Sequence, residues 1–172
     1  MKVHGIQHVG FTVPDMAQAV SFFETLFGAV TCLSTGPLLV DDAYMARRLG
    51  AAEASRIRDI RVLRAGNGAN LEIFEYAGDP EADSPAPRNS QPGGYHIAFE
   101  VDDCLAAADR LRAAEVDVLD GPTYVDAGPM EGLTWCYLRT QWGQFLEIVS
   151  MDGPLGAERA GGPPQWSPKA RG

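Results

Sequence analysis

The sequence has few basic residues and no long apolar stretch. Its 172 residues include 14 Lys and Arg against 23 Asp and Glu, which gives a net charge of −9. Because proteins bind nucleic acids largely through Lys and Arg, this balance argues against a nucleic-acid partner. No apolar run approaches the roughly 20 residues of a membrane span, and the N-terminal residues do not resemble a signal peptide, so we expect no membrane partner.

Cysteine is also scarce. The three cysteines are an odd number and show no CxxC spacing, which argues against a disulfide framework or a zinc knuckle and favours a cytoplasmic protein. Hydrophobic residues make up 45% of the chain and charged residues 22%, so the composition is that of a folded protein. Its length suits one ordinary domain or two small modules that share a core.

An internal repeat favours two modules. The segment HVGFTVPD, which starts at His8, returns as HIAFEVDD, which starts at His96, at an offset of 88 residues. A second pair of segments, GANLEI from Gly68 and GQFLEI from Gly143, has an offset of 75 residues. The first half therefore carries extra residues between its two segments, and we expect an added helix there at about 41–50.

Each half shows the same order of predicted elements. Alternating apolar residues at Val9, Phe11 and Val13 predict a strand, and apolar residues at spacings of three and four predict the helix that follows. Acidic residues at Asp15 and near Asp102 are typical helix N-caps. Three further strands are expected in each half, at 30–34, 57–64 and 70–76 and at 116–119, 133–140 and 144–150. The sequence thus predicts an α+β fold with two βαβββ modules.

The domain organisation follows from this repeat. We expect a first module at 1–77, a linker rich in Pro, Ser, Asp and Gly at 78–94, and a second module at 95–151. The remaining residues, 152–172, form a tail rich in Gly and Pro.

Four side chains occupy equivalent places in the two modules. If the alternating apolar residues of each strand face the helix, His8 and His96 point to the opposite, concave face. The same geometry places Glu72 and Glu147 on that face. A single His or Glu in a strand is usually structural or on the surface. The alternative interpretation is therefore that the repeat reflects duplication of a module that binds no metal. Two imidazoles and two carboxylates suit a divalent metal among Zn, Ni, Co, Mn and Fe, because two carboxylates in an apolar cavity repel each other without a cation.

With these segments, the chain resembles the vicinal oxygen chelate superfamily, the group of glyoxalase I, methylmalonyl-CoA epimerase, extradiol dioxygenases and bleomycin and fosfomycin resistance proteins. The resemblance covers about residues 4–150. It implies that the paired modules form a cupped, partly open barrel around one divalent metal ion. It also implies that His8, Glu72, His96 and Glu147 are the ligands, and that a homodimer is an option, since many members form dimers.

The resemblance implies a glyoxalase-like or epimerase-like lyase or isomerase. Its substrate would be a small molecule that chelates the metal through a carbonyl and a neighbouring oxygen, and the metal would stabilise the charge formed on proton abstraction. We expect Glu147 to be the base and Glu72 its catalytic partner. Two alternatives stay open. One is an Fe(II) extradiol-type dioxygenase with His8, His96 and Glu147 as ligands, and the other is a non-catalytic small-molecule or antibiotic-binding resistance protein.

Further residues are candidates for substrate binding. Thr12 points to the concave face where glutathione-using glyoxalases have an Arg, which argues against glutathione as a co-substrate. Phe74, Phe145 and Trp142 either line the cavity or pack in the core. Arg47, on the expected added helix, either contacts an anionic substrate or lies on a solvated helix face.

Overall fold

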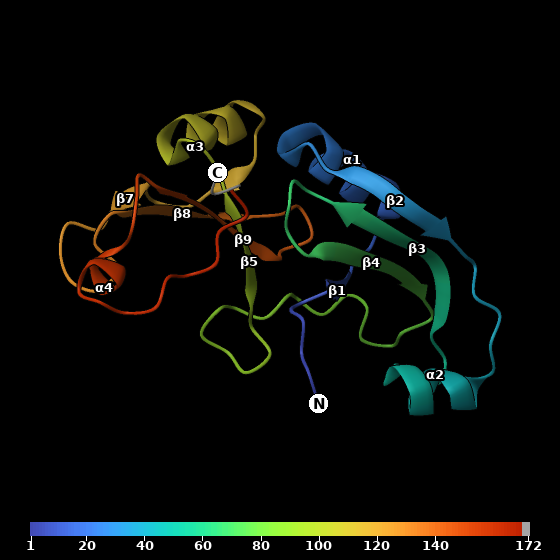
Figure 1. Cartoon of the computed structure of the whole chain (residues 1–172). Coiled ribbons are helices and arrows are strands. Elements are labelled where there is room, and N and C mark those ends of the chain that lie inside the picture. The colour runs from blue at the N-terminus through green and yellow to red at the C-terminus, as the bar shows by residue number, and fades with distance from the viewer. Residues whose placement is uncertain (170–172) are drawn as a thin grey trace. The chain divides into compact units, whose positions relative to one another are not determined.

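The computed structural model describes residues 1–169 and divides into two compact units, Met1–Ser84 and a second unit that begins at Pro85 (Figure 1). The boundary falls inside the segment expected as a linker. The last three residues of the expected tail lie outside the described residues. Among residues 1–169, no helix is both long enough and apolar enough to cross a membrane.

The first unit is a four-stranded sheet with one helix packed on one face. A second helix lies between the second and third strands in the sequence. The sheet order is β1-β4-β3-β2, with β1 parallel to β4 and the other pairs antiparallel. The elements are β1 (His8–Thr12), α1 (Met16–Phe27), β2 (Val30–Thr35), α2 (Asp42–Leu49), β3 (Arg56–Arg64) and β4 (Asn70–Ala77). The helix α2 accounts for the extra residues in the first half of the repeat.

The helix α1 begins and ends where its sequence provides caps. The carboxylate of Asp15 accepts a hydrogen bond from the backbone N–H of Gln18 at 2.9 Å, which satisfies one of the free N–H groups of the first turn. Gly28 ends the helix in the left-handed conformation, with φ of 61°, where glycine is free of Cβ strain. The apolar stripe of α1 is buried against the sheet, and Phe23 is fully buried. This packing fixes which face of the sheet turns away from the helix.

The second unit repeats this architecture with additional short elements. The sheet order is β5-β9-β8-β6, with β5 parallel to β9, and β7 also pairs with β8. The elements are β5 (His96–Glu100), α3 (Cys104–Ala113), β6 (Asp117–Val118), β7 (Thr123–Tyr124), β8 (Leu133–Arg139), β9 (Phe145–Met151) and α4 (Gly156–Arg159). The α+β fold with a βαβββ order in each half is thereby confirmed.

Three details of the second unit differ from the expectation. The N-cap of α3 is Asp103, one residue beyond Asp102, and its carboxylate accepts hydrogen bonds from the backbone N–H groups of Leu105 and Ala106. The two-residue strand β7 was not expected. The tail contains the short helix α4, although its composition had given no helical pattern.

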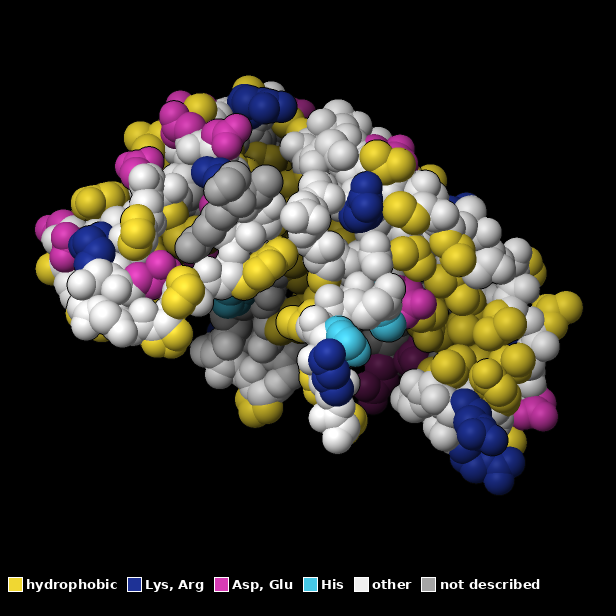
Figure 2. All heavy atoms as spheres, viewed as in Figure 1, with side chains coloured by type: hydrophobic (Ala, Val, Ile, Leu, Met, Phe, Trp, Pro, Cys, Tyr) yellow, Lys and Arg dark blue, Asp and Glu magenta, His cyan; other side chains and the backbone are white. Residues whose placement is uncertain are grey.

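The face of the first sheet that turns away from α1 is apolar. Residues that are paired across neighbouring strands point to the same side, and the register places Leu33, Val62 and Glu72 in one row. The next row contains Ile60 and Phe74. In Figure 2, hydrophobic side chains gather over the β2 to β4 part of this unit. Glu72 is thus a single carboxylate in largely apolar surroundings.

Candidate functional site

The first unit brings His8 and Glu72 together. Strand β1 runs parallel to β4 with Gly10 opposite Glu72, so the imidazole of His8 and the carboxylate emerge on the face that turns away from α1. His8 Nε2 lies 3.3 Å from Glu72 Oε2, and the two side chains are 47% and 29% exposed. The absence of a side chain at Gly10 leaves room beside the carboxylate, since a Cβ there would lie 3.8 Å from Glu72 Oε2.

The second unit brings His96 and Glu147 together in the same way. Here β5 runs parallel to β9 with Ala98 opposite Glu147. His96 Nε2 lies 3.2 Å from Glu147 Oε2, and the side chains are 36% and 13% exposed. Burial raises the pKa of Glu147 from its ordinary value, against the opposing influence of the neighbouring His96. Glu147 is therefore the less hydrated of the two carboxylates.

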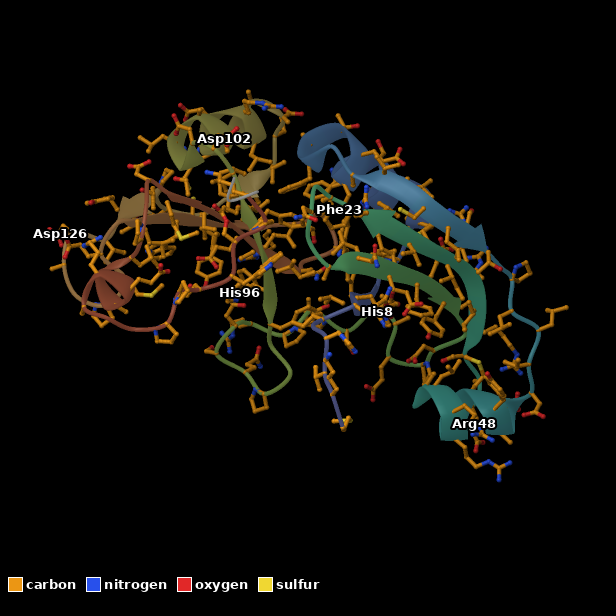
Figure 3. The ribbon with its side chains drawn as sticks, viewed as in Figure 1. His8, Phe23, Arg48, His96, Asp102 and Asp126 are labelled. Carbon is orange, nitrogen blue, oxygen red and sulfur yellow. The ribbon has the colours of Figure 1, made fainter. Side chains whose placement is uncertain are left out.

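The two His–Glu pairs are equivalent in register as well as in sequence. His8 lies opposite Asn70 and His96 opposite Phe145, and in each case the glutamate is two residues further along the partner strand. Figure 3 shows His8 at the start of β1 and His96 at the start of β5. The remaining histidine, His4, is exposed and precedes β1.

The surroundings of the two pairs differ. In the second unit, Tyr137 on β8 lies directly opposite Glu147, and its ring meets the ring of His96 edge to face at 5.0 Å. Trp135 packs against the other side of Tyr137 at 5.5 Å. The corresponding place in the first unit, opposite Glu72, is occupied by Val62. A hydroxyl group therefore accompanies only one of the two acids at this position.

Two of the expected substrate-binding residues share the Glu72 face. Thr12 is exposed at the end of β1 and lies opposite Phe74, two residues beyond Glu72 on β4. The Phe74 ring is partly exposed and stacks on Tyr76 at 5.7 Å. Because it is not buried beneath the helix, Phe74 is available to a ligand on this face.

Phe145 and Trp142 lie at one end of the second sheet. Phe145 shares the Glu147 face, and the guanidinium of Arg139 lies 5.1 Å above its ring. Trp142 is in the turn between β8 and β9, and its indole N–H donates to the side-chain oxygen of Gln144 at 3.1 Å. Phe145 is thus a candidate contact for a ligand, whereas Trp142 supports the turn that joins the two central strands.

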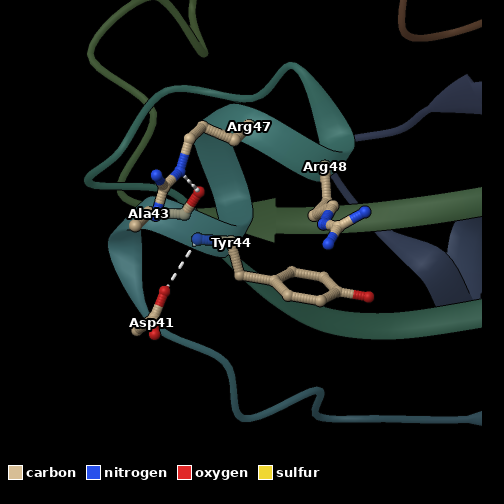
Figure 4. A pocket seen from close by; sticks show the side chains of 5 residues that line it. All are labelled: Asp41, Ala43, Tyr44, Arg47 and Arg48. Carbon is tan, nitrogen blue, oxygen red and sulfur yellow. Dashed lines mark hydrogen bonds between the residues drawn. The ribbon is translucent and has the colours of Figure 1, made fainter.

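Arg47 belongs to a surface pocket on α2, which Figure 4 shows together with its lining residues Asp41, Ala43, Tyr44 and Arg48. The Arg47 Nε donates to the carbonyl oxygen of Ala43 on the same helix at 3.4 Å. Among residues 1–169, Arg47 has no polar contact with the face that carries Glu72. A role for Arg47 in substrate binding stays a prediction.

The helix side of the first sheet carries two other acids. Glu75 accepts a hydrogen bond from the backbone N–H of Met16, the first residue of α1, at 2.8 Å. Asp59 lies opposite Glu75 and pairs with Arg61 beside α1. Both acids lie on the opposite face from Glu72, and Glu75 supports the start of the helix.

Sequence reasoning did not single out Tyr137 or the capping role of Glu75. Alternation along β8 places Tyr137 on the concave face, but its position opposite Glu147 depends on the length of the turn between β8 and β9. The backbone hydrogen bond of Glu75 joins residues 59 positions apart, so no local pattern indicates it.

The donor atoms of both pairs fit a divalent metal of the first transition row. Each unit by itself offers one imidazole nitrogen and one carboxylate, and within residues 1–169 no group of three or more His, Cys, Asp or Glu is gathered. Mixed nitrogen and oxygen ligands suit Zn, Mn, Fe, Co and Ni. A four-ligand site therefore requires one pair from each unit.

Comparison with known proteins gives a family and a relative of described activity. Residues 7–134 match the family model of the glyoxalase/bleomycin resistance protein/dioxygenase superfamily. A 2-epi-5-epi-valiolone epimerase from Actinomyces sp. is 42% identical over 156 residues, which cover 88% of this chain and 81% of the epimerase.

Solved structures show the same fold at low sequence identity. A glyoxalase family protein from Bacillus cereus matches with a TM-score of 0.70 at 18% identity, covering 89% of this chain and 97% of that protein. A mutant of the fosfomycin resistance protein FosX from Listeria monocytogenes matches with a TM-score of 0.55 at 16% identity, covering 86% and 90%. That mutant was solved in complex with Mn(II) and 1S,2S-dihydroxypropylphosphonic acid.

Proposed function

Because this chain belongs to the glyoxalase/bleomycin resistance protein/dioxygenase superfamily, we propose that it is a metal-dependent epimerase that inverts a carbon centre next to a carbonyl group. The observation that carries this proposal is the duplicated His–Glu contact, at 3.3 Å in one unit and 3.2 Å in the other. The 42% identical epimerase supports inversion of a stereocentre as the reaction.

In this proposal, His8, Glu72, His96 and Glu147 hold one divalent ion. The ion supplies Lewis acidity, which stabilises negative charge on a substrate oxygen. Within each unit, the imidazole and the carboxylate lie close enough together to bind the same ion. Glu147 is only 13% exposed, so the cation also offsets the cost of a poorly hydrated carboxylate.

Glu147 is the proposed base. A carboxylate that is bound to a metal is a weak base, so a chelating substrate would have to displace Glu147 from the ion before its Oε2 takes the proton from the carbon next to the carbonyl. Glu72 is the proposed acid, which returns a proton to the other face of the same carbon. Removal from one face and return to the other inverts the centre, which is the net result of an epimerase.

The proposed substrate is a small oxygen-rich ketone such as 2-epi-5-epi-valiolone, on which the Actinomyces relative acts. The largely apolar face around Glu72 suits the carbon skeleton of such a molecule. The dioxygenase alternative would use His8, His96 and Glu147, but the exposed His4 is then the one histidine left as an acid or base.

The test is an isotope exchange assay with 2-epi-5-epi-valiolone in D2O. Purified protein is stripped with a chelator, reloaded separately with Mn, Fe, Co, Ni or Zn, and followed by proton NMR. We expect one carbon-bound proton to exchange with deuterium while the second epimer accumulates, and both changes to disappear in the stripped protein.

Variants then identify the base. The Glu147→Gln variant should lose at least about 1,000-fold in rate, because an amide cannot accept the proton. Glu115→Gln is the matched control, since Glu115 is an exposed acid of the same unit and lies outside the sheet. Exchange in the stripped protein, or in Glu147→Gln at the wild-type rate, would contradict the proposal.

A further inference from the structure

The hydroxyl group of Tyr137 is placed beside the second His–Glu pair and has no partner there. Its strand position is opposite Glu147, and its ring contacts the ring of His96 at 5.0 Å. The side chain is partly buried, and among residues 1–169 its hydroxyl has no hydrogen-bond partner. The hydroxyl oxygen still reaches solvent, so a ligand oxygen can replace water as the acceptor of its hydrogen bond.

The ring of Tyr137 is held firmly. Trp135 on the same face of β8 packs on one side at 5.5 Å and His96 on the other. A fixed ring directs its hydroxyl to a fixed place, which reduces the entropy lost when a ligand binds. Arg139 is two residues further along β8 on the same face. Its guanidinium lies over the ring of Phe145 and 3.7 Å from the carboxylate of Asp117.

The first unit has no hydroxyl at the register position opposite its acid. Val62 occupies the same register position opposite Glu72, and Leu33 follows it in the same row. The residue directly opposite the acid is therefore a tyrosine in the second unit and a valine in the first, while Phe74 and Tyr76 share the Glu72 face further along β4. A ligand at the His96–Glu147 pair therefore meets a hydroxyl directly opposite the acid, and a ligand at the His8–Glu72 pair meets an aliphatic side chain there.

We propose that Tyr137 is a substrate-binding residue, whose hydroxyl donates a hydrogen bond to an oxygen of an oxygen-rich ketone that binds at the His96–Glu147 pair. This inference rests on the proposed function, because it requires a ligand whose oxygens lie beside His96 and Glu147.

The test compares Tyr137→Phe with the wild type and with Tyr124→Phe. The first variant keeps the ring and its contact with His96 and removes the hydroxyl alone. The control loses a hydroxyl from an exposed tyrosine of the same unit, on β7. Dissociation constants for Co(II)-loaded protein are measured by calorimetry with two probes, 2-epi-5-epi-valiolone and acetohydroxamate, a small bidentate oxygen ligand. Cobalt content is measured in each sample, and KM and kcat are measured with the ketone.

For Tyr137→Phe we expect dissociation constants and KM about five- to tenfold higher, since one lost hydrogen bond is worth about 1 kcal/mol. Cobalt content and kcat should stay within twofold of the wild type, and Tyr124→Phe should match the wild type throughout. Unchanged affinity for both probes in Tyr137→Phe, or loss of cobalt in that variant, overturns the inference.

The two proposals fail separately. Wild-type protein that binds acetohydroxamate but neither binds nor converts the ketone refutes the proposed substrate, and the hydroxamate affinities then decide the role of Tyr137. Wild-type protein that binds neither probe overturns the Tyr137 inference, because no oxygen-rich ligand then lies at this face.

Discussion

Two glutamates three residues apart on β4 should behave in opposite ways when each is replaced by alanine. Glu75 supports the start of α1, since its carboxylate accepts from the backbone N–H of Met16 at 2.8 Å and lies 3.5 Å from the guanidinium of Arg58. Glu72 has His8 as its polar neighbour, at 3.3 Å on the other face of the sheet. We expect Glu75→Ala to cost stability and Glu72→Ala to cost metal binding.

The magnitudes follow from these contacts. The Glu75 side chain is 17% exposed, and a hydrogen bond to a charged group contributes about 1.5–3 kcal/mol. The partner Arg58 is 64% exposed, so the ion pair adds at most about 1 kcal/mol. Glu75→Ala should therefore lower the free energy of unfolding by about 2–3 kcal/mol. Glu72 and His8 are both substantially exposed, so Glu72→Ala should change it by less than about 0.5 kcal/mol.

Urea unfolding of the metal-free proteins measures both effects. The three tryptophans, Trp135, Trp142 and Trp166, all belong to the second unit, so circular dichroism at 222 nm must accompany tryptophan fluorescence to report the first unit. Metal titration of the same variants should show weaker binding for Glu72→Ala and wild-type binding for Glu75→Ala. Equal losses of stability in the two variants, or a Glu75→Ala variant as stable as the wild type, would refute this assignment of the two faces.

Two further predictions concern the thiols and the cap of α3. Burial raises the pKa of Cys104 to about 11, and it also raises that of Cys136, so a thiol reagent at pH 8 should modify the exposed Cys32 at once and the other two only after unfolding. The pKa of Cys104 in the folded protein exceeds its ordinary value of 9.0, so the unfolded chain releases this proton first as the pH rises. The free energy of unfolding should therefore fall between pH 9 and about 11, by at most ~3 kcal/mol. A Cys104→Ala variant with the same alkaline loss of stability would argue against this. Asp103→Ala should lower the free energy of unfolding by about 1 kcal/mol, while Asp102→Ala should leave it unchanged in the same urea titration.

The positions of the two His–Glu pairs could be predicted from the sequence because alternation in a strand is a local property. Once Val9 and Phe11 face the helix, His8 must face the other way, and the same argument applies to Glu72 between Leu71 and Ile73. The strand register in the structure places both residues of each pair on this face. That the two pairs share one metal remains a prediction, as do the homodimer and the cytoplasmic location.

Other features depend on interactions that no local pattern encodes. Asp102 and Asp103 are both suitable caps, and the backbone at the start of α3 decides between them, with Asp103 in the extended conformation. The strand β7 has two residues and the helix α4 has four, so each exists only through its tertiary contacts. The helix α4, for example, is held by Arg159, which pairs with Glu131 at 2.7 Å.

The two halves of the chain also differ on the face away from the helices, and this pattern bears on the proposed function. Equivalent positions of the first strands hold Thr12, which is exposed, and Glu100, whose carboxylate accepts a hydrogen bond from Ser167 of the tail at 2.7 Å. The positions opposite the paired acids hold Val62 and Tyr137. Core packing requires apolar residues on the helix side of both sheets, whereas the proposed asymmetric substrate would require different residues on the ligand face of each. Exchanging these two residues, Val62→Tyr with Tyr137→Val, should therefore keep metal binding and lower kcat/KM for the ketone at least tenfold, and an unchanged kcat/KM would show that this asymmetry does not orient the substrate.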